Sequence, residues 1–416
     1  MDLKNHPCFN DKVRHLFARV HLPVAPKCNV QCNFCNRKFD CVNESRPGVS
    51  SAVLSPGQAL AYLEKMMEKM PNISVVGIAG PGDPFANPDE TMETLRRVRE
   101  RYPEMLLCVA TNGLNLFPYL DDLKALNVSH VTVTVNAVDP KIGAQIYSWI
   151  RDGKRLYRGE EGARLLLEIQ KGSIQGLIKR EMTTKINSII IPGINDFHIE
   201  EVAKEMAFLK ADILNAIPLY KNIGTVFEHI DEPTKEEIHE IRRKISVHIP
   251  QMHHCTRCRA DAAGILGKDD PESVNLIQAF AALPLNPKEK RPFVAVGTME
   301  GLLINRHLGE AVEFWIFEKT ENGFGLVEKR KAPAPGSGNQ RWEELARIFK
   351  DCRSALVGGV GKTPKEILER NGIKVFETEG FINDALELVY SGKESRLNIK
   401  ATTCGLSCSG TGTGCG

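Results

Sequence analysis

The strongest constraint on the fold is an alternation of strand-like and helix-like segments that runs from residue 15 to residue 281. The strand candidates are short, rich in β-branched or aliphatic residues and bounded by Gly, Pro or Asn. They are Leu16–Pro23, Ile73–Ala79, Leu106–Thr111, Val131–Ala137, Ile186–Ile191 and Ile213–Leu219. Amphipathic helices are predicted between them, the first beginning at Ser55–Pro56. Six such repeats predict an α/β fold in which helices cover a parallel sheet and the site lies at the carboxyl ends of the strands.

A Pro-rich, charged stretch, Leu283–Pro292, is interpreted as a linker between two domains. Shorter strand and helix patterns follow it and predict a small α/β domain. We therefore expect a first domain over residues 1–281, a linker over 282–292, a second domain over 293–392 and a flexible tail, rich in Cys and Gly, over 393–416.

Composition argues against several classes of protein. Lys and Arg (54) nearly balance Asp and Glu (52), so the formal net charge is +2. This balance does not indicate a nucleic-acid binder. No run of about 18 apolar residues predicts a membrane span, and the N-terminal residues lack the apolar core of a signal peptide. We expect a cytoplasmic protein with no membrane or nucleic-acid partner.

The chain has 12 cysteines, and they are unevenly placed. Cytoplasmic thiols stay reduced, so grouped thiols indicate metal ligands. Cys28, Cys32 and Cys35 stand at positions i, i+4 and i+7 after the first predicted strand. Three thiolates can hold three irons of a [4Fe–4S] cubane and leave the fourth iron open. The alternative is a zinc knuckle completed by Cys41 or His21.

This spacing, with Phe34 before the third cysteine, resembles the radical S-adenosylmethionine (SAM) superfamily. The resemblance implies a partial (β/α)6 barrel in which SAM binds the open iron and is cleaved to a 5′-deoxyadenosyl radical. Gly80, Gly82 and Asp83 occupy the place of the family's glycine-rich turn, which meets the SAM amino group; a plain turn is the alternative. Further SAM contacts are expected from Thr111, Asn112, Asn136, Ile191 and Asn195.

Five more cysteines lie in or beside the first predicted domain. Cys255 and Cys258 form a pair that is most often half of a zinc site, but Cys41 could complete a ligand set for a second cubane. Cys8 and Cys108 could hold a third cubane with an imidazole, although Cys108 by itself also fits a buried, inert thiol.

Several longer segments resemble the NifB family of nitrogenase cofactor biosynthesis proteins. These segments are residues 6–8, 21–28, 44–48, 79–84, 132–140 and 255–262. The resemblance implies an enzyme that fuses two [4Fe–4S] substrate clusters, inserting a SAM-derived carbide and an extra sulfur. The product is the eight-iron precursor of the nitrogenase cofactor. Its expected partners are a cluster donor, cofactor carrier or scaffold proteins, and an electron donor such as ferredoxin or flavodoxin.

The same resemblance implies three metal sites. Their ligands are Cys28, Cys32 and Cys35 for the SAM cluster, Cys8, Cys108 and His21 for one substrate cluster, and Cys41, Cys255 and Cys258 for the other. His6 is the second choice for the imidazole, while His253 and His254 are placed nearer the other site. Glu44 and Arg46 are candidates for proton management during hydrogen loss from the methyl carbon; a helix cap or surface pair is the alternative.

The second domain resembles NifX-like cofactor carriers, with a ribonuclease-H-like fold, through Val294–Gly297 and Asn305–Gly309. His307 there is either a labile cluster ligand or a surface histidine.

Residues 358–363 look like a phosphate loop, but Leu356 stands where such a loop needs Gly, so we predict no nucleotide hydrolysis.

Two other functions stay open from the sequence. One is a radical SAM enzyme that acts on a peptide or small molecule and uses its extra clusters only as electron relays. The other is a zinc-binding scaffold that carries clusters without chemistry.

Overall fold

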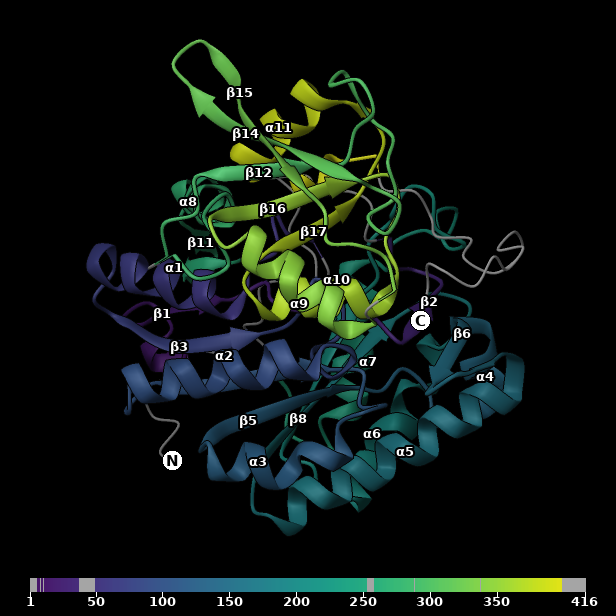
Figure 1. The fold of residues 1–416 in the computed structure, drawn as a ribbon. Helices are drawn as coiled ribbons and strands as arrows, with labels where there is room; N and C mark the ends of the chain where they lie inside the picture. The colour runs from purple at the N-terminus through teal and green to yellow at the C-terminus, as the bar shows by residue number, and fades with distance from the viewer. Residues whose placement is uncertain are drawn as a thin grey trace. The chain divides into compact units, whose positions relative to one another are not determined.

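In the computed structural model the chain is described at residues 6–7, 9, 11–36, 49–252, 258–287, 289–336 and 338–398 (Figure 1). The chain divides into two compact units, Met1–Asn275 and Leu276–Gly416. Each unit has its own central sheet.

The first unit is built on an eight-stranded sheet in the order β11-β10-β1-β3-β4-β5-β8-β9. The six strands from β1 to β9 pair in parallel, and β10 and β11 add an antiparallel edge. Their bounds are β1 Ala18–His21, β3 Ile73–Ile78, β4 Leu106–Thr111, β5 Val128–Thr134, β8 Thr183–Ile190, β9 Ile213–Pro218, β10 Ala263–Ile265 and β11 Lys268–Asp269. The predicted α/β fold is confirmed.

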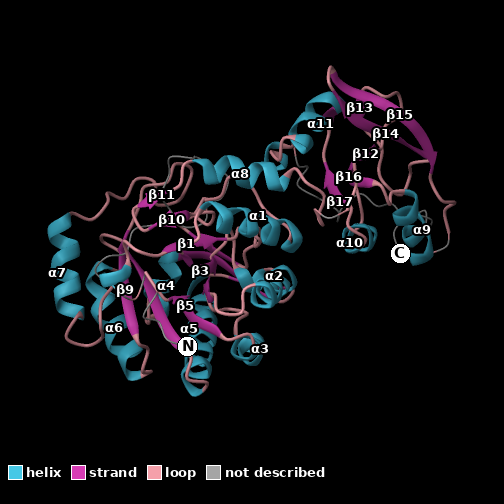
Figure 2. Ribbon diagram, turned by 90° about the vertical axis from the view of Figure 1, so that its left-hand side faces the viewer, coloured by secondary structure: helices cyan, strands magenta, loops and turns pink. Residues whose placement is uncertain are grey.

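Helices connect the parallel strands, and Figure 2 shows α1, α2, α3 and α6 along the outer side of the sheet. The connecting helices are α1 Pro56–Lys69, α2 Pro88–Arg101, α3 Leu120–Ala125, α4 Pro140–Ile146, α5 Gly159–Lys179 and α6 Ile199–Phe208. Two helices follow β9, namely α7 Lys235–Ile245 and α8 Glu272–Ala281, and the division between the two units falls within α8. The start of α1 shows why the sequence folds this way. The Ser55 side chain accepts from the Gln58 N–H, the Gln58 side chain bonds back to Ser55, and Pro56 opens the helix.

A separate three-stranded sheet holds the cysteine loop. It runs in the order β2-β6-β7, with β2 at Val30–Cys32, β6 at Tyr147–Asp152 and β7 at Arg155–Tyr157. β2 pairs antiparallel with β6, so the loop that follows β1 is clamped by a hairpin from the middle of the chain.

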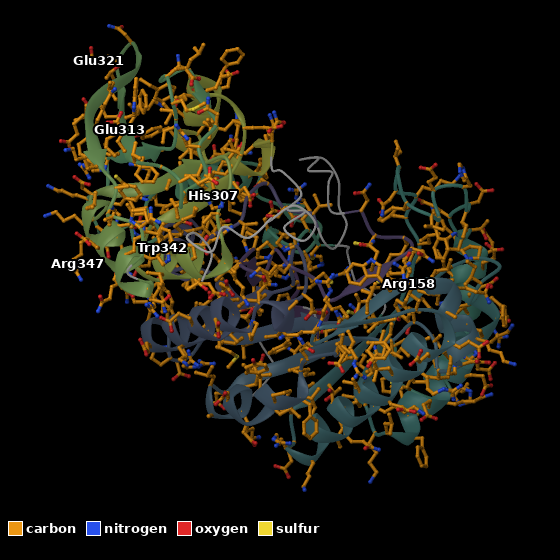
Figure 3. All side chains as sticks on the ribbon, turned by 45° about the vertical axis from the view of Figure 1, so that its right-hand side comes forward. Arg158, His307, Glu313, Glu321, Trp342 and Arg347 are labelled. Carbon is orange, nitrogen blue, oxygen red and sulfur yellow. The ribbon has the colours of Figure 1, made fainter. Side chains whose placement is uncertain are left out.

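The second unit has a five-stranded sheet in the order β15-β14-β12-β16-β17. The bounds are β12 Phe293–Val296, β14 Glu313–Thr320, β15 Gly323–Lys331, β16 Cys352–Val357 and β17 Lys374–Glu377, with a small pair β13 Leu303–Ile304 and β18 Gly380–Phe381. Helices α9 Asn339–Ile348, α10 Lys362–Arg370 and α11 Ile382–Tyr390 complete it. His307 and Trp342 belong to this unit (Figure 3).

Two strands, β5 and β8, begin three residues earlier than their apolar patterns predict. The sequence favours a start at Val131, but β5 begins at Val128 because the chain turns out of α3 through Asn127, which has a positive φ of 58°. The strand β5 therefore includes Ser129 and His130, two buried polar residues.

Among the described residues, no helix is both long enough and apolar enough to cross a membrane.

Candidate functional site

The loop of Cys28, Cys32 and Cys35 is ordered by its own hydrogen bonds. The Cys35 N–H donates to the Cys32 carbonyl at 3.1 Å, and the Gln31 side-chain amide donates to the carbonyls of Cys32 (3.0 Å) and Cys35 (2.9 Å). All three thiols are half-buried. The loop that follows β1 therefore presents three half-buried thiols in an ordered backbone.

The turn that contains Gly80 and Gly82 packs directly on the chain that leads to Cys28. Gly82 N–H donates to the Ala25 carbonyl at 2.6 Å, and Ala25 N–H donates to the Gly80 carbonyl at 3.2 Å. A Cβ on Gly82 would overlap the Lys27 carbonyl. Only glycine permits this approach.

Asp83 joins this turn to the end of β4. Its buried carboxylate accepts from the Thr111 hydroxyl at 2.9 Å, from the Asn112 N–H at 2.6 Å and from the Phe85 N–H at 2.9 Å. Burial raises the pKa of Asp83, and these donors oppose the rise. Asp83 therefore links two turns, and its carboxylate oxygens accept hydrogen bonds from Phe85, Thr111 and Asn112.

Asn112 connects the end of β4 to the cysteine loop. Its side-chain amide donates to the Asn29 side-chain oxygen at 2.7 Å, and its nitrogen lies 3.9 Å from Cys28 Sγ. The Asn29 amide nitrogen is buried and has no acceptor among the described residues. A buried hydrogen-bond donor normally has an acceptor. A group bound at the loop that carries sulfur or oxygen would provide the acceptor for the Asn29 amide. The residues present therefore fit an iron–sulfur cluster with SAM.

Asn136, Ile191 and Asn195 lie together at the ends of β5 and β8. The Asn136 side-chain oxygen accepts from the Ile189 N–H at 2.9 Å, and the Asn195 amide donates to the Asn136 carbonyl at 2.8 Å. The Asn136 amide donates to the Tyr147 hydroxyl at 3.2 Å. These side-chain amides tie strand ends together, and Ile191 packs in the same apolar cluster as Cys32 and Phe34.

Four neighbouring strands carry a lateral row of residues. The register aligns His21 of β1 with Gly77 of β3, Gly77 with Cys108 of β4, and Cys108 with His130 of β5. A Cβ on Gly77 would lie 2.8 Å from Cys108 Sγ and 3.2 Å from His21 Nε2. The missing side chain of Gly77 therefore leaves a space that this thiol and this imidazole border.

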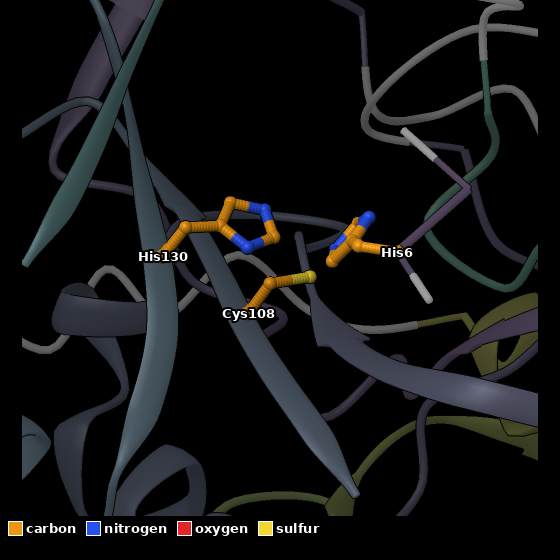
Figure 4. A group of neighbouring side chains, drawn as sticks. All are labelled: His6, Cys108 and His130. Carbon is orange, nitrogen blue, oxygen red and sulfur yellow. The ribbon is translucent and has the colours of Figure 1, made fainter. Parts of the chain in front are cut away.

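His6 joins this row from the segment before β1. The ligand atoms of His6, Cys108 and His130 lie within 4.8 Å of one another, and Figure 4 shows the three side chains converging. Cys108 is half-buried and both histidines are buried.

Hydrogen bonds assign the ring protons of two of these histidines. His21 Nδ1 lies 3.0 Å from the Arg259 carbonyl, which only accepts, so Nδ1 carries the proton and Nε2 keeps its lone pair. The Ser129 hydroxyl donates to the Leu107 carbonyl at 2.6 Å, so at 3.3 Å it accepts from His130 Nδ1. Metal-bound imidazoles show the same arrangement, with the outer N–H given to a protein oxygen.

Burial also keeps these imidazoles neutral. Burial, with the positive charge of Arg19, lowers the pKa of His21 to about 4. Burial, with Lys185, lowers the pKa of His6 to about 3, and burial lowers the pKa of His130 well below its ordinary value. A neutral imidazole is the form that binds a metal.

Cys258 lies beside Arg19, two residues before His21 on β1. Arg19 donates to Cys258 Sγ at 3.1 Å and to the Asp269 carboxylate at 2.6 Å, and it is almost fully buried. Burial works against its charge, but Cys258 and Asp269 raise the pKa of Arg19 above its ordinary value. A guanidinium at this distance stabilises a thiolate.

Five predicted site residues lie outside the described residues, namely Cys8, Cys41, Glu44, Arg46 and Cys255. Two described residues at the site are missing from the sequence-based predictions, Arg19 and His130. The signal for both was a polar residue inside an apolar strand, which marks a buried group that needs a partner.

Comparison with known proteins agrees with this geometry. The family model of the radical SAM superfamily matches residues 22–206, and the dinitrogenase iron-molybdenum cofactor model matches residues 290–392. The FeMo cofactor biosynthesis protein NifB of Chlorobaculum tepidum is 53% identical over 421 residues, which cover 100% of this chain and 99% of that protein. The protein of the same name from Klebsiella pneumoniae is 39% identical over 403 residues, 89% of this chain and 86% of that protein.

Membership of the radical SAM superfamily implies SAM and a [4Fe–4S] cluster as cofactors. The C-terminal match, to a family named for the cofactor itself, is consistent with a role in nitrogenase cofactor assembly. The chain therefore belongs to the NifB family, as a radical SAM enzyme of FeMo cofactor biosynthesis.

Proposed function

We propose that this enzyme fuses two [4Fe–4S] substrate clusters around a carbon atom from SAM and adds one sulfur, forming the eight-iron precursor of the nitrogenase cofactor. One observation carries the proposal. His21 of β1 and Cys108 border the space left by Gly77, while Arg19, two residues before His21, donates to Cys258. Residues two apart on a strand share a face, and the Cys28 loop follows the same strand. This arrangement supports two substrate sites beside the proposed SAM site.

Cys28, Cys32 and Cys35 are the proposed ligands of the resident cluster. When bound there, the cluster and SAM supply a methyl group and a 5′-deoxyadenosyl radical. The Gly80–Asp83 turn lets the backbone come close, and Asn29 and Asn112 offer amide donors beside Cys28. We assign the rest of the SAM pocket to Thr111, Asn136, Ile191 and Asn195, which shape the neighbouring strand ends.

Cys8, Cys108 and His21 are the proposed ligands of the first substrate cluster. His21 presents a neutral Nε2 because its Nδ1–H is held by the Arg259 carbonyl. Few anchors of mixed type hold a cluster while allowing the product to leave. Cys41, Cys255 and Cys258 are the proposed ligands of the second substrate cluster, where Arg19 stabilises the Cys258 thiolate.

Glu44 and Arg46 are proposed to accept and relay protons as hydrogen leaves the methyl carbon. The test is Glu44→Gln, which keeps the shape of the side chain and removes its basicity. Loss of carbide insertion with methyl transfer retained is expected. Full carbide insertion by the variant would remove Glu44 from the mechanism.

We propose that residues 293–392 hold the product for transfer to a carrier or scaffold protein. The match of this region to a family named for the cofactor supports the role. The Gly309 N–H donates to His307 Nδ1 at 3.1 Å, so the neutral ring carries its proton on Nε2. In this arrangement His307 offers a hydrogen-bond donor to a cluster sulfide, and ligation requires the ring proton to move. A cluster donor and a small electron-transfer protein are the other proposed partners.

The test uses the full chain, purified and reconstituted without oxygen. Three cubanes predict about twelve irons per chain. With SAM and dithionite, we expect both S-adenosylhomocysteine and 5′-deoxyadenosine, and labelled methyl carbon in an extractable cluster. Cys258→Ala should keep SAM cleavage and lose labelled product, whereas Cys28→Ala should lose SAM cleavage.

The rival functions give different results in the same experiment. About four irons with 5′-deoxyadenosine alone would contradict the proposal. About twelve irons without labelled carbon in a cluster would favour relay clusters and a peptide or small-molecule substrate. Zinc without sulfide would favour a scaffold.

A further inference from the structure

His6 and His130 converge on Cys108, and neither histidine has a part in the cluster sites proposed above. A ring nitrogen of each lies within 4.8 Å of the other and of Cys108 Sγ (Figure 4). We propose that His6, Cys108 and His130 bind a single divalent transition-metal ion, of borderline softness such as Fe²⁺ or Zn²⁺, when no substrate cluster is bound. The site is argued from these described residues and does not depend on the proposed cluster fusion.

The spacing of the three ligand atoms favours one ion. A tetrahedral ion with bonds of about 2.0–2.3 Å holds its ligand atoms roughly 3.3–3.8 Å apart. The observed limit of 4.8 Å is only about 1 Å wider, which small side-chain rotations can close. Ligands on different irons of a cubane stand further apart, because an iron–iron distance separates their bonds.

The residues around His6, Cys108 and His130 suit a preformed metal site. Ser129 takes the Nδ1 proton of His130 and leaves a lone pair on Nε2. The His6 and His130 rings meet edge to face with centroids 4.6 Å apart, and Phe9 packs against both at 5.0 and 4.6 Å. An aromatic ring over both imidazoles limits their rotation, so little freedom is lost when an ion binds.

Two imidazoles and one thiolate select a particular class of metal. Imidazole suits Fe²⁺, Co²⁺ and Zn²⁺, whereas Mg²⁺ and Ca²⁺ prefer oxygen ligands. Three protein ligands leave a fourth position for water. Because Cys108 is shared with the proposed substrate-cluster site, the ion and the cluster exclude one another. Zinc held here is therefore expected to block loading of one cluster.

The test is a Co²⁺ titration of the full chain, purified without oxygen and stripped of metal with a chelator. Co²⁺ bound to thiolate gives a charge-transfer band, and a four-coordinate site gives strong visible bands. Other thiols of the chain also bind Co²⁺, so the result is the difference between the parent and each variant.

We expect His6→Gln and His130→Gln each to weaken one Co²⁺ equivalent at least about tenfold. Cys108→Ser should remove the charge-transfer intensity of that equivalent. His198→Gln is the matched control, because His198 is also buried but bonds to the Val138 N–H elsewhere in the unit. Far-ultraviolet circular dichroism of each variant reports whether it is folded.

Unchanged Co²⁺ binding in both histidine variants would overturn the proposal, as would an effect of Cys108→Ser alone. A second measurement tests the metal site separately from the proposed function. Zinc added before reconstitution should lower iron incorporation by about four irons per chain more in the parent than in His6→Gln, and chelation should restore it. A Co²⁺ site of the expected kind in a protein that makes no labelled cluster would leave the inference standing and the proposed fusion refuted.

Discussion

Single glycines decide how closely the groups of these sites approach one another. At Gly77 the absent side chain opens the space between Cys108 Sγ and His21. At Gly82 it lets the Asp83 turn sit on the Lys27 carbonyl, one residue before Cys28. In both places the constraint is the volume of one methyl group, so the sites are sensitive to the smallest substitution.

Gly82→Ala is predicted to loosen the cysteine loop. The added Cβ overlaps a backbone carbonyl that cannot rotate away, which destabilises the fold by about 1–3 kcal/mol. Iron retention by the resident cluster and SAM binding should fall as well. Gly172→Ala in α5 is the control, since a Cβ there meets nothing within 4 Å. Equal iron retention in the two variants would contradict the close-packing argument.

A buried histidine outside the metal sites gives a prediction for pH. Burial lowers the pKa of His198, whose Nε2 accepts from the Val138 N–H at 3.1 Å. The unfolded ring takes up its proton near pH 6.5, and the folded ring does so only at lower pH. The unfolded state therefore binds more protons in this window, so this contribution to stability is complete above about pH 6.5 and is lost as the pH falls.

His198→Gln keeps a hydrogen-bond acceptor and removes the titration. Denaturant unfolding from pH 7.5 to 5 should show a smaller loss of stability for this variant than for the parent. His239→Gln, at an exposed position of α7, should follow the parent curve. Parallel curves for the parent and His198→Gln would refute the assignment.

At the scale of elements, the hairpin β6–β7 supports the cysteine loop from the side. Ile150 of β6 pairs with Val30 of β2, and its fully buried side chain lies in the apolar cluster against which Cys32 and Phe34 pack. The strand that ends at Cys32 thus depends on a segment more than a hundred residues away in the chain.

Ile150→Ala should reduce stability by about 2–5 kcal/mol and also reduce iron retention at the Cys28 loop, because the cavity lies beneath it. Ile174→Ala in α5 removes the same volume from an equally buried position. It should cost similar stability with normal iron retention. If both variants lose iron to the same extent, the effect is one of general stability.

The strands and helices could largely be predicted, and the row of ligands could not. β4 matches its expected bounds, because it carries an apolar pattern of strand period. β5 starts three residues early because Ser129 and His130 are polar residues that its apolar run excludes. The small sheet β2-β6-β7 joins segments too far apart in sequence for any local pattern to pair.

At the scale of the molecule, each unit has its own core. One apolar cluster around Phe314 and Phe349, whose ring centroids are 5.0 Å apart, consists entirely of residues of the second unit. A cluster around Val30 and Ile191 consists entirely of residues of the first. Each core is therefore expected to tolerate damage to the other.

Phe314→Ala is predicted to destabilise the second unit by about 3–5 kcal/mol while the full chain still cleaves SAM at the parent rate. Calorimetry should show one of two transitions moving to lower temperature. Leu95→Ala, at a fully buried position of α2, should move the other transition. A single transition that shifts in both variants would show that the two cores unfold together.

The sequence by itself determined the chemistry and the kind of scaffold. The spacing of Cys28, Cys32 and Cys35, the turn at Gly80–Asp83 and the alternating strand and helix periods are local properties of the chain. These local features are enough to identify a radical SAM unit, and the longer matching segments are enough to identify the family.

Only the tertiary structure decided which side chains meet. His21, Gly77, Cys108 and His130 come together because the register of four strands aligns them, and register depends on packing across the whole sheet. The proton positions on His21 and His130 depend in turn on the carbonyl of Arg259 and the hydroxyl of Ser129. No spacing along the chain encodes a contact between strands, so a histidine becomes a candidate ligand only where the folded sheet places it beside a thiol.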